Sequence, residues 1–361
     1  SSDPEGDRLG VIRQREDCEA LAERKGWPVA EVYIDDDRSA YSGKPRPEYR
    51  RLLENEVREL WKSKLKVRMD RCPACGGSAP AKAFEKWGVA YSKCPGCDSI
   101  FAASRPDEEA LAGFYDRSAA VEFWREKVLH ATESARLEKL LVPRCEWILD
   151  GLSEYFPGAV TALDHTPFSA PLLKLLADQL PSLESCISAH PLSRGSVHSK
   201  VILSVGALYA KPAPKVDFIT AFDAFDRAAD PKKFVSAIAG CLNPGGVAFL
   251  TATSASGLEI QILGAHSPSI LPPDRLNLFS IEGLESVFHE AEWEICEIST
   301  PGMLDVGVIQ RHLKNEKPSG SLAFFDYMIR SRGPECLEAF QEFLQANRLS
   351  SFARLIVRKK R

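Results

Sequence analysis

Residues 217–252 read DFITAFDAFDRAADPKKFVSAIAGCLNPGGVAFLTA and contain two short apolar runs, at 217–222 and 246–252. The second run follows the pair Gly245-Gly246, and glycine allows the positive φ that a tight turn before a strand requires. Short apolar runs that alternate with helical sequence are typical of buried strands in a parallel sheet. This stretch therefore predicts an α/β unit.

The same alternation extends over residues 158–361. The candidate strands are 160–163, 185–189, 201–205, 217–222, 246–252, 293–299 and 352–357. Such a series predicts an α/β fold with a doubly wound, Rossmann-like sheet of seven strands.

Composition limits the possible classes of protein. The chain has 361 residues, of which 44% are hydrophobic, so it can form two or three domains with more than one core. A net charge of -4 gives no overall attraction to nucleic acid or to anionic membranes. No apolar run approaches the roughly 18 residues of a membrane span. We therefore expect a cytoplasmic protein with neither a membrane nor a nucleic-acid partner.

Four of the ten cysteines form two CxxC pairs, Cys72/Cys75 and Cys94/Cys97, separated by 18 residues. This spacing predicts two knuckles that present four thiolates to one tetrahedral Zn²⁺ ion. Residues 82–92, between the pairs, alternate like a hairpin. Four protein ligands leave no position for water, so the zinc would be structural. Four unrelated free cysteines, or a redox dithiol, explain the spacing less well.

The first 57 residues are predicted to contain a helix around 12–22 and a strand at 29–34, and helical spacing follows at 49–61. The segments RQREDC at 13–18 and DDRSAYSGKPRP at 36–47 resemble the large serine recombinases. The resemblance implies a truncated resolvase-like α/β fragment with Ser1 at the nucleophile position. The arginines that would stabilise a phosphoryl transition state are missing from it. We interpret the fragment as a gene-fusion relic, followed by a linker at 58–71, with Met69 as a natural start for the rest.

A second resemblance covers the chain from about Cys72 to the C-terminus. It rests on the stretch 217–231, on LNPGGV at 242–247, on LPP at 271–273, on LNLFS at 276–280 and on TPG at 300–302. These motifs resemble class I S-adenosylmethionine-dependent methyltransferases with an N-terminal zinc ribbon, including sugar C-methyltransferases. The resemblance implies a zinc ribbon at 72–104, a helical linker or lid at 105–157 and a methyltransferase domain at 158–361. It also implies S-adenosylmethionine as cofactor and a small acceptor such as a nucleotide-linked sugar.

The cofactor loop departs from the family pattern. The loop after the first strand is LDHTPFS at 163–169, without the family's glycines, and no acid follows the second strand, where His190 stands. Side chains and a proline should crowd the cofactor there. The residues that the resemblance places at the cofactor are Asp164, His165, Thr166, His190, Phe222 and Asp223.

Two family histidines that could act as bases are also replaced. Asp226-Arg227 stands where the family has Glu-His, and Arg275 stands where it has His. Arginine cannot act as a general base at ordinary pH. The candidate catalytic residues are Asp226, Arg227, Arg275 and His165, the last as a replacement base. Arg227 and Arg275 could instead form an anion-binding pair suited to a phosphate.

Three functions follow from these patterns. The first is an active methyltransferase on a nucleotide-linked sugar or similar small molecule. The second is a catalytically inactive methyltransferase fold that serves as a binding or assembly protein with a protein partner. The third is a recombinase remnant that binds DNA. Fold alone does not decide between them, because function resides in sites.

Overall fold

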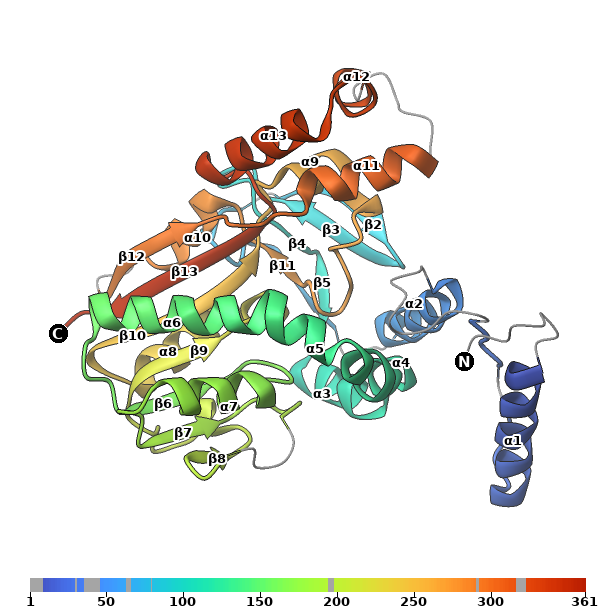
Figure 1. The fold of residues 1–361 in the computed structure, drawn as a ribbon, viewed down its shortest axis with the longest axis horizontal. Coiled ribbons are helices and arrows are strands. Elements are labelled where there is room, and N and C mark those ends of the chain that lie inside the picture. Colours follow the sequence, from blue (N-terminus) through green and yellow to red (C-terminus); the bar gives the residue numbers. More distant parts are fainter. Residues whose placement is uncertain are drawn as a thin grey trace.

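The computed structural model describes residues 9–29, 31–35, 46–62, 66–78, 80–193, 198–289, 292–315 and 323–361. A seven-stranded sheet forms the centre of the fold, in the order β12-β13-β10-β9-β6-β7-β8 (Figure 1). These strands are Trp293–Ser299, Phe352–Lys359, Leu242–Thr253, Val216–Ala221, Thr161–Asp164, Ser185–Ser188 and Val201–Leu203. The predicted doubly wound sheet is confirmed, and each predicted strand has a counterpart.

The sheet is parallel from β10 to β8, and β13 is antiparallel to both of its neighbours, β10 and β12. The pairing of Asp164 with Thr220 and Ser188 places the ends of β6, β9 and β7 at one edge. Ligands of open α/β sheets bind beyond this carboxyl edge, near the point where the strand order reverses.

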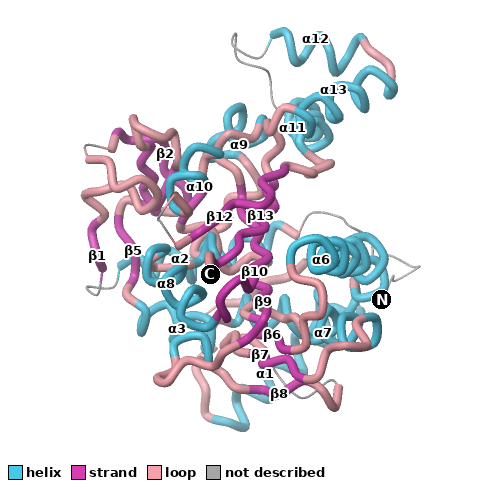
Figure 2. The backbone as a smooth tube through the Cα atoms, turned by 90° about the vertical axis from the view of Figure 1, so that its left-hand side faces the viewer, coloured by secondary structure: helices cyan, strands magenta, loops and turns pink. Residues whose placement is uncertain are grey.

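Helices cover both faces of the sheet, as Figure 2 shows. Alternate strand residues such as Ala162, Phe218 and Phe249 pack against α6 (Val142–Tyr155) and α7 (Ala170–Gln179). The intervening residues face α8 (Pro231–Cys241) and α10 (Ile281–Val287). This two-sided burial explains why the central strands β6, β9 and β10 are largely apolar and do not alternate.

The remaining helices lie before and between the strands. They are α3 (Glu108–Arg117), α4 (Ala119–Phe123), α5 (Glu133–Arg136), α9 (Leu258–Leu263), α11 (Asp305–Asn315), α12 (Ala323–Ser331) and α13 (Pro334–Ala346), with π-helical turns at Trp124–Leu129 and Leu137–Leu141. Short 3₁₀ turns lie at Ala207–Tyr209, Phe225–Arg227 and Gly264–His266. Residues 108–141 are mainly helical, and we call them the lid after the role expected for 105–157, which stays a prediction. Among the described residues, no helix combines the length and apolar composition that crossing a membrane requires.

The cysteine-bearing segment forms a second, four-stranded sheet in the order β11-β4-β3-β2. Its strands are Asn277–Leu278, Ile100–Ala102, Val89–Lys93 and Ala81–Lys86. The hairpin expected at 82–92 is the β2–β3 pair. The edge strand β11 comes from the loop between β10 and β12. The ribbon sheet is thus completed by a distant segment of the chain.

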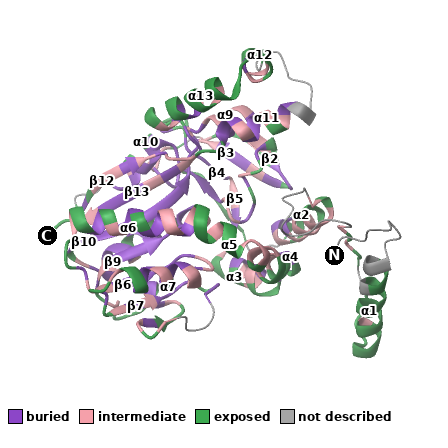
Figure 3. Cartoon of the chain, in the orientation of Figure 1, coloured by how far each residue is buried: buried purple, intermediate pink, exposed green. Residues whose placement is uncertain are grey.

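The N-terminal segment divides into an exposed and a packed part. In α1 (Leu9–Lys25) nearly all described side chains are exposed, as Figure 3 shows. The strand predicted at 29–34 is wrong, since its described residues form no strand. Val29, Val32 and Ile34 are exposed, and a strand without a pairing partner is not stable.

Helix α2 (Pro47–Lys62) belongs to the packed part. Val57 and Trp61 are buried in one cluster with Trp87, Val89 and other ribbon residues. The boundary predicted after residue 57 therefore falls inside a helix. The linker predicted at 58–71 is wrong as well, because α2 continues to Lys62 and β1 (Lys66–Arg68) pairs with β5 (Ser104–Pro106).

The carboxylate of Glu56, also on α2, caps the start of α4. It accepts hydrogen bonds from the Ser118 hydroxyl at 2.5 Å and from the Ala119 N–H at 2.8 Å. A carboxylate at a helix N-terminus satisfies free N–H groups and complements the helix dipole. This contact explains in part how α2 holds the lid in place.

We expect Trp61→Ala to lower the free energy of unfolding by about 3 to 5 kcal/mol, because it leaves a cavity against the ribbon. Trp27→Ala is the matched control, since Trp27 is 61% exposed while Trp61 is 6% exposed, and should change stability by about 0.5 kcal/mol or less. Urea unfolding of both variants measures the difference. Equal effects would contradict the packing of α2 against the ribbon.

Candidate metal centre and ligand crevice

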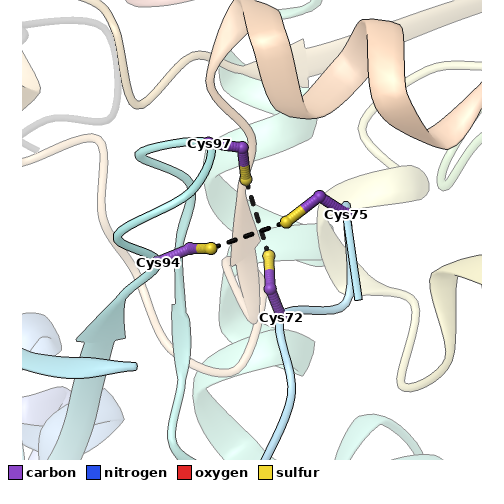
Figure 4. Close-up of side chains that lie close together, drawn as sticks. All are labelled: Cys72, Cys75, Cys94 and Cys97. Carbon is purple, nitrogen blue, oxygen red and sulfur yellow. Dashed lines mark hydrogen bonds between the residues drawn. The ribbon is translucent and has the colours of Figure 1, made fainter. Parts of the chain in front are cut away.

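The four cysteines of the CxxC pairs meet at the end of the ribbon (Figure 4). The Sγ atoms of Cys72 and Cys97 are 3.6 Å apart, those of Cys75 and Cys94 are 3.5 Å apart, and all four lie within 4.8 Å of one another. A tetrahedron with Zn–S bonds of about 2.3 Å has S–S edges of about 3.8 Å. The cluster could therefore hold one metal ion of the size and preference of zinc.

Backbone groups turn toward these sulfurs. The N–H of Gly77 donates to Cys75 Sγ and that of Gly96 donates to Cys94 Sγ, each at 3.4 Å. A Cβ on Gly77 would lie 3.2 Å from Cys75 Sγ, so a side chain would crowd the cluster. Gly76 has φ +74°, which favours glycine. These turns fit a set of metal-binding thiolates.

The cysteine cluster is joined directly to the large sheet. Ser280, which caps α10, donates its hydroxyl to the carbonyl of Cys97, and its N–H donates to Ser99 Oγ at 3.1 Å. A Cβ on Gly283 would come within 2.1 Å of Ser99 Oγ. The knuckle and α10 therefore fit together without space for a further methyl group.

Cys75→Ser should abolish stoichiometric zinc binding and lower the melting temperature, because three thiolates hold the ion less tightly and the knuckle supports α10. Cys336→Ser changes an exposed cysteine outside the cluster and should leave both quantities unchanged. Zinc content by elemental analysis and a thermal melt measure them. Full zinc content in the Cys75 variant would contradict the four-thiolate site.

The loop after β6 is organised by Asp164, which is fully buried. Its carboxylate accepts hydrogen bonds from Ser169 Oγ at 2.5 Å, Thr220 Oγ1 at 2.7 Å and the Thr166 N–H at 3.2 Å. Burial raises the pKa of Asp164 to about 6, although these hydrogen bonds oppose the shift. The hydrogen bonds of Asp164 thus hold the loop in its conformation and tie it to β9.

His165 and His190 meet beyond the ends of β6 and β7, with ring centroids 4.8 Å apart. Both are buried, and His165 also packs against Phe234 and Tyr209. Burial lowers the pKa of His165 to about 4 and lowers that of His190 well below its ordinary value. Both rings are therefore neutral at pH 7. His190 Nδ1 accepts from the Leu192 N–H at 3.0 Å, whereas His165 Nδ1 is buried without a hydrogen-bond partner.

Phe168 closes the loop. It has φ +56°, a conformation that glycine adopts without strain, and its ring packs 5.1 Å from that of Trp124 in the lid. The N–H of His165 donates to the Thr220 carbonyl at 2.7 Å, so this backbone donor is also engaged. The buried rings of His165 and His190 thus occupy the carboxyl ends of β6 and β7, the place that we call the crevice.

The second group of predicted residues lies at the ends of β9 and β10. Phe222 is buried, and the Arg144 guanidinium lies 5.1 Å from its ring centre. Asp223 accepts a hydrogen bond from Arg144 at 3.0 Å and lies 3.5 Å from Arg275. Burial alone would raise the pKa of Asp223, but Arg144 and Arg275 outweigh it and lower the pKa to about 2.

Asp226 is buried beside Asp223. Its Oδ2 accepts from the Thr253 N–H at 2.9 Å and from the Thr253 hydroxyl at 2.8 Å, while Oδ1 has no hydrogen-bond partner. Burial raises the pKa of Asp226 to about 6, opposed by Arg275. A buried carboxylate with a free oxygen and a raised pKa is a group that could take up a proton.

Arg227 and Arg275, which we expected as an anion-binding pair, both lie beside carboxylates. Arg227 binds Asp274 at 2.9 Å and donates to the Asp223 carbonyl at 3.0 Å. Arg275 lies 3.4 Å from Asp226, close enough for an ion pair but without the geometry of a hydrogen bond. Each guanidinium thus has carboxylate partners in this structure, and the anion-binding pair stays a prediction.

Several residues of this cluster were missed from the sequence, among them Arg136, Arg144 and Arg354. Arg136 and Arg144 are eight residues apart in one helical run, close to two turns, and could have been placed on the same face. Arg354 lies on the last strand, and nothing in its local sequence marks it. Ser1, the recombinase-like position, lies outside the described residues.

Asp164→Asn provides a test of the buried carboxylate. The raised pKa means that folded Asp164 holds a proton more tightly than unfolded Asp164. Its stabilising contribution is present below its ordinary pKa of 3.8 and is lost as pH rises through about 6. The free energy of unfolding of the wild type minus that of the variant should therefore be larger at pH 4 than at pH 7. The change in this difference should be on the order of 2 kcal/mol.

Urea unfolding at both pH values measures this difference. Asp116→Asn, at an exposed aspartate, is the control and should show little pH dependence relative to wild type. A wild-type advantage that grows toward pH 7 would contradict the raised pKa.

The strand order, with an antiparallel strand between β10 and β12, defines a Rossmann-like fold of the class I methyltransferase type. The chain belongs to the methyltransferase-domain family, whose model matches residues 83–298 and so covers more than half of the sequence. A second family model, the N-terminal domain of resolvases, matches residues 1–67. Both resemblances seen in the sequence are confirmed.

Solved structures of methyltransferases are similar at low identity. A putative sarcosine dimethylglycine methyltransferase from Galdieria sulphuraria is 16% identical, covering 61% of this chain and 86% of that one, with a TM-score of 0.37. The plantazolicin methyltransferase BpumL in complex with SAH is 11% identical, covering 70% and 94%, with a TM-score of 0.42. A complex between the Haloferax volcanii Trm112 methyltransferase activator and the putative methyltransferase is 15% identical. The match covers 61% of this chain and 95% of that one, with a TM-score of 0.39. No curated protein matches the chain.

Proposed function

We propose that this protein is a methyltransferase-fold binding protein that does not use S-adenosylmethionine. The observation that carries the proposal is the filled crevice beyond β6 and β7. His165 and His190 occupy it as neutral, buried rings, and Phe168 closes it against the lid. In the family, the backbone of the loop after the first strand lies against the cofactor. In this chain, side chains cover the backbone of the corresponding loop, 163–169.

The second part of the proposal concerns the four-cysteine cluster, to which we assign a structural Zn²⁺ ion. Four thiolates complete a tetrahedral shell, so no position remains for a water molecule or a substrate. The ion would fix the knuckle that docks on α10. Its role is then to support the large sheet.

Titration of the zinc-loaded full chain with S-adenosylmethionine, and separately with S-adenosylhomocysteine, tests the cofactor proposal. We expect no saturable heat and no shift in melting temperature at millimolar ligand, because the crevice is filled. A ligand present at 100 times its Kd would stabilise the fold by about 2.7 kcal/mol. Saturable binding with a matching rise in melting temperature would refute the proposal.

A second candidate is an active methyltransferase on a nucleotide-linked sugar, and Asp226 favours it. The free Oδ1 and the raised pKa suit a general base that takes a proton from a carbon or hydroxyl of the acceptor. If the wild type transfers labelled methyl groups to a nucleotide sugar and Asp226→Asn does not, this candidate holds. Absence of transfer by the wild type supports the binding protein.

For the resolvase-like segment we propose a role in the fold instead of DNA strand exchange. Its helix α2 buries Val57 and Trp61 against the ribbon and caps α4 through Glu56. These contacts make the second half of the matched segment part of the methyltransferase-like body.

A further inference from the structure

A cavity of about 200 Å³ lies between the lid and the first turn of α7. Its polar lining consists of Arg125, His130, Glu133 and Arg136 from the lid, and Phe168 of the crevice loop forms part of the opposite wall. The cavity thus adjoins the filled crevice but is a separate space.

The lining is predominantly basic. Glu133 is its one acidic member, and it lies 3.7 Å from His130, while Arg125 lies 3.5 Å from Glu126. Arg136 forms no ion pair within 4.0 Å in the described part of the chain. A guanidinium that lines a cavity without a carboxylate partner has donors available for a ligand.

Arg136 is held by stacking. Its guanidinium lies 5.6 Å from the ring centre of Trp124, which in turn packs on Phe168. A cation–π contact of this kind uses none of the guanidinium's N–H donors in hydrogen bonds to carboxylates. Burial lowers the pKa of Arg136 and the neighbouring Arg144 lowers it further, while the more distant charge of Asp223 opposes the shift. An anion in the cavity would relieve both the lost hydration and the repulsion between these arginines.

Two further arginines follow in sequence of contact: the charge of Arg144 acts on Arg136, and it also acts on Arg354, which Glu297 partly offsets. Arg144 on α6 is buried, and its counter-ion Asp223 is shared with Arg275. Arg354 on β13 lies 5.1 Å from the ring centre of Trp147. The Nε atoms of Arg144 and Arg354 are both buried without a hydrogen-bond partner. The positive charge of the arginines on this side of the sheet is therefore only partly neutralised by carboxylates.

The start of α7 adds a second attraction for an anion. Ser169, at the N-cap position, donates its hydroxyl to Asp164 and makes no capping hydrogen bond to the helix. Pro171, in the first turn, lines the cavity. The N-terminus of α7, which is the positive end of its dipole, thus lies beside the cavity.

We propose that this cavity is an anion subsite that takes a phosphate or diphosphate group of a small molecule, with Arg125 and Arg136 as its donors. The planar fork of arginine matches phosphate oxygens bidentately. The cavity is smaller than the roughly 300 to 1,000 Å³ of pockets for drug-sized ligands, so the charged group enters and the rest of the molecule lies outside. The inference rests on the proposed function, because it supplies the ligand class of a binding protein without the methyl donor.

Inorganic pyrophosphate is the probe, titrated by calorimetry into the zinc-loaded full chain at low ionic strength. The wild type should bind it saturably, and Arg136→Gln should weaken binding at least tenfold. Arg136→Lys keeps the charge but loses the fork, so its affinity should fall between the two. Arg332→Gln removes an exposed arginine that follows α12 and is the matched control. Thermal melts establish that every variant is folded.

Two results would overturn the subsite. One is absence of saturable pyrophosphate binding by the wild type, and the other is equal weakening by Arg136→Gln and Arg332→Gln, which would indicate non-specific attraction. Titration of the same proteins with S-adenosylhomocysteine separates the two proposals. Cofactor binding with intact pyrophosphate binding refutes only the proposed function. Cofactor binding that Arg136→Gln abolishes, with pyrophosphate binding unchanged, refutes the subsite, because the arginine would then serve the carboxylate of the cofactor.

Discussion

The buried guanidinium of Arg105 joins the ribbon to the large sheet. It donates to the Asn277 side chain at 2.7 Å and to the Ala229 carbonyl at 2.8 Å. Burial lowers the pKa of Arg105 to about 10, so the group is charged at neutral pH and must keep these partners. Asn277 in turn donates to the Ala228 carbonyl at 2.9 Å. The loop that carries Asp226 is therefore held from the ribbon side.

The large sheet could be predicted because its central strands are apolar and buried on both faces, so each of them can be recognised from its own sequence. The cysteine cluster could be predicted because thiolate geometry fixes the spacing of CxxC pairs. Strand β11 could not, since Asn277 and Leu278 pair with Phe101 and Ile100 nearly 180 residues earlier. Nothing local to two residues indicates such a partner. The packing of α2 was missed for the same reason, since Trp61 reads only as one apolar residue of an amphipathic helix.

The sequence predicted which residues lie at the crevice but not how their side chains pack. The sequence shows that the loop at 163–169 lacks glycines and that His165 and His190 stand there and after the second strand. Side chains of this size leave less room at the ends of β6 and β7. The charge cluster was not foreseen. Arg227 and Arg275 lie where the family has histidines, yet the carboxylates of Asp223, Asp226 and Asp274 already occupy them. The arginines that remain without such partners come from α5 and β13, far apart in the sequence, and only the fold brings them to one side of the sheet.

The origin of β11 also bears on how the protein is made. The ribbon sheet receives its last strand only after the chain has passed residue 278, although its cysteines are complete by residue 97. During synthesis, the thiolates can therefore gather before the sheet that supports them is finished. Contacts between segments so distant in sequence close late and slow the search for the native state. An early-bound metal ion would keep the knuckle folded until its partner strand is synthesised.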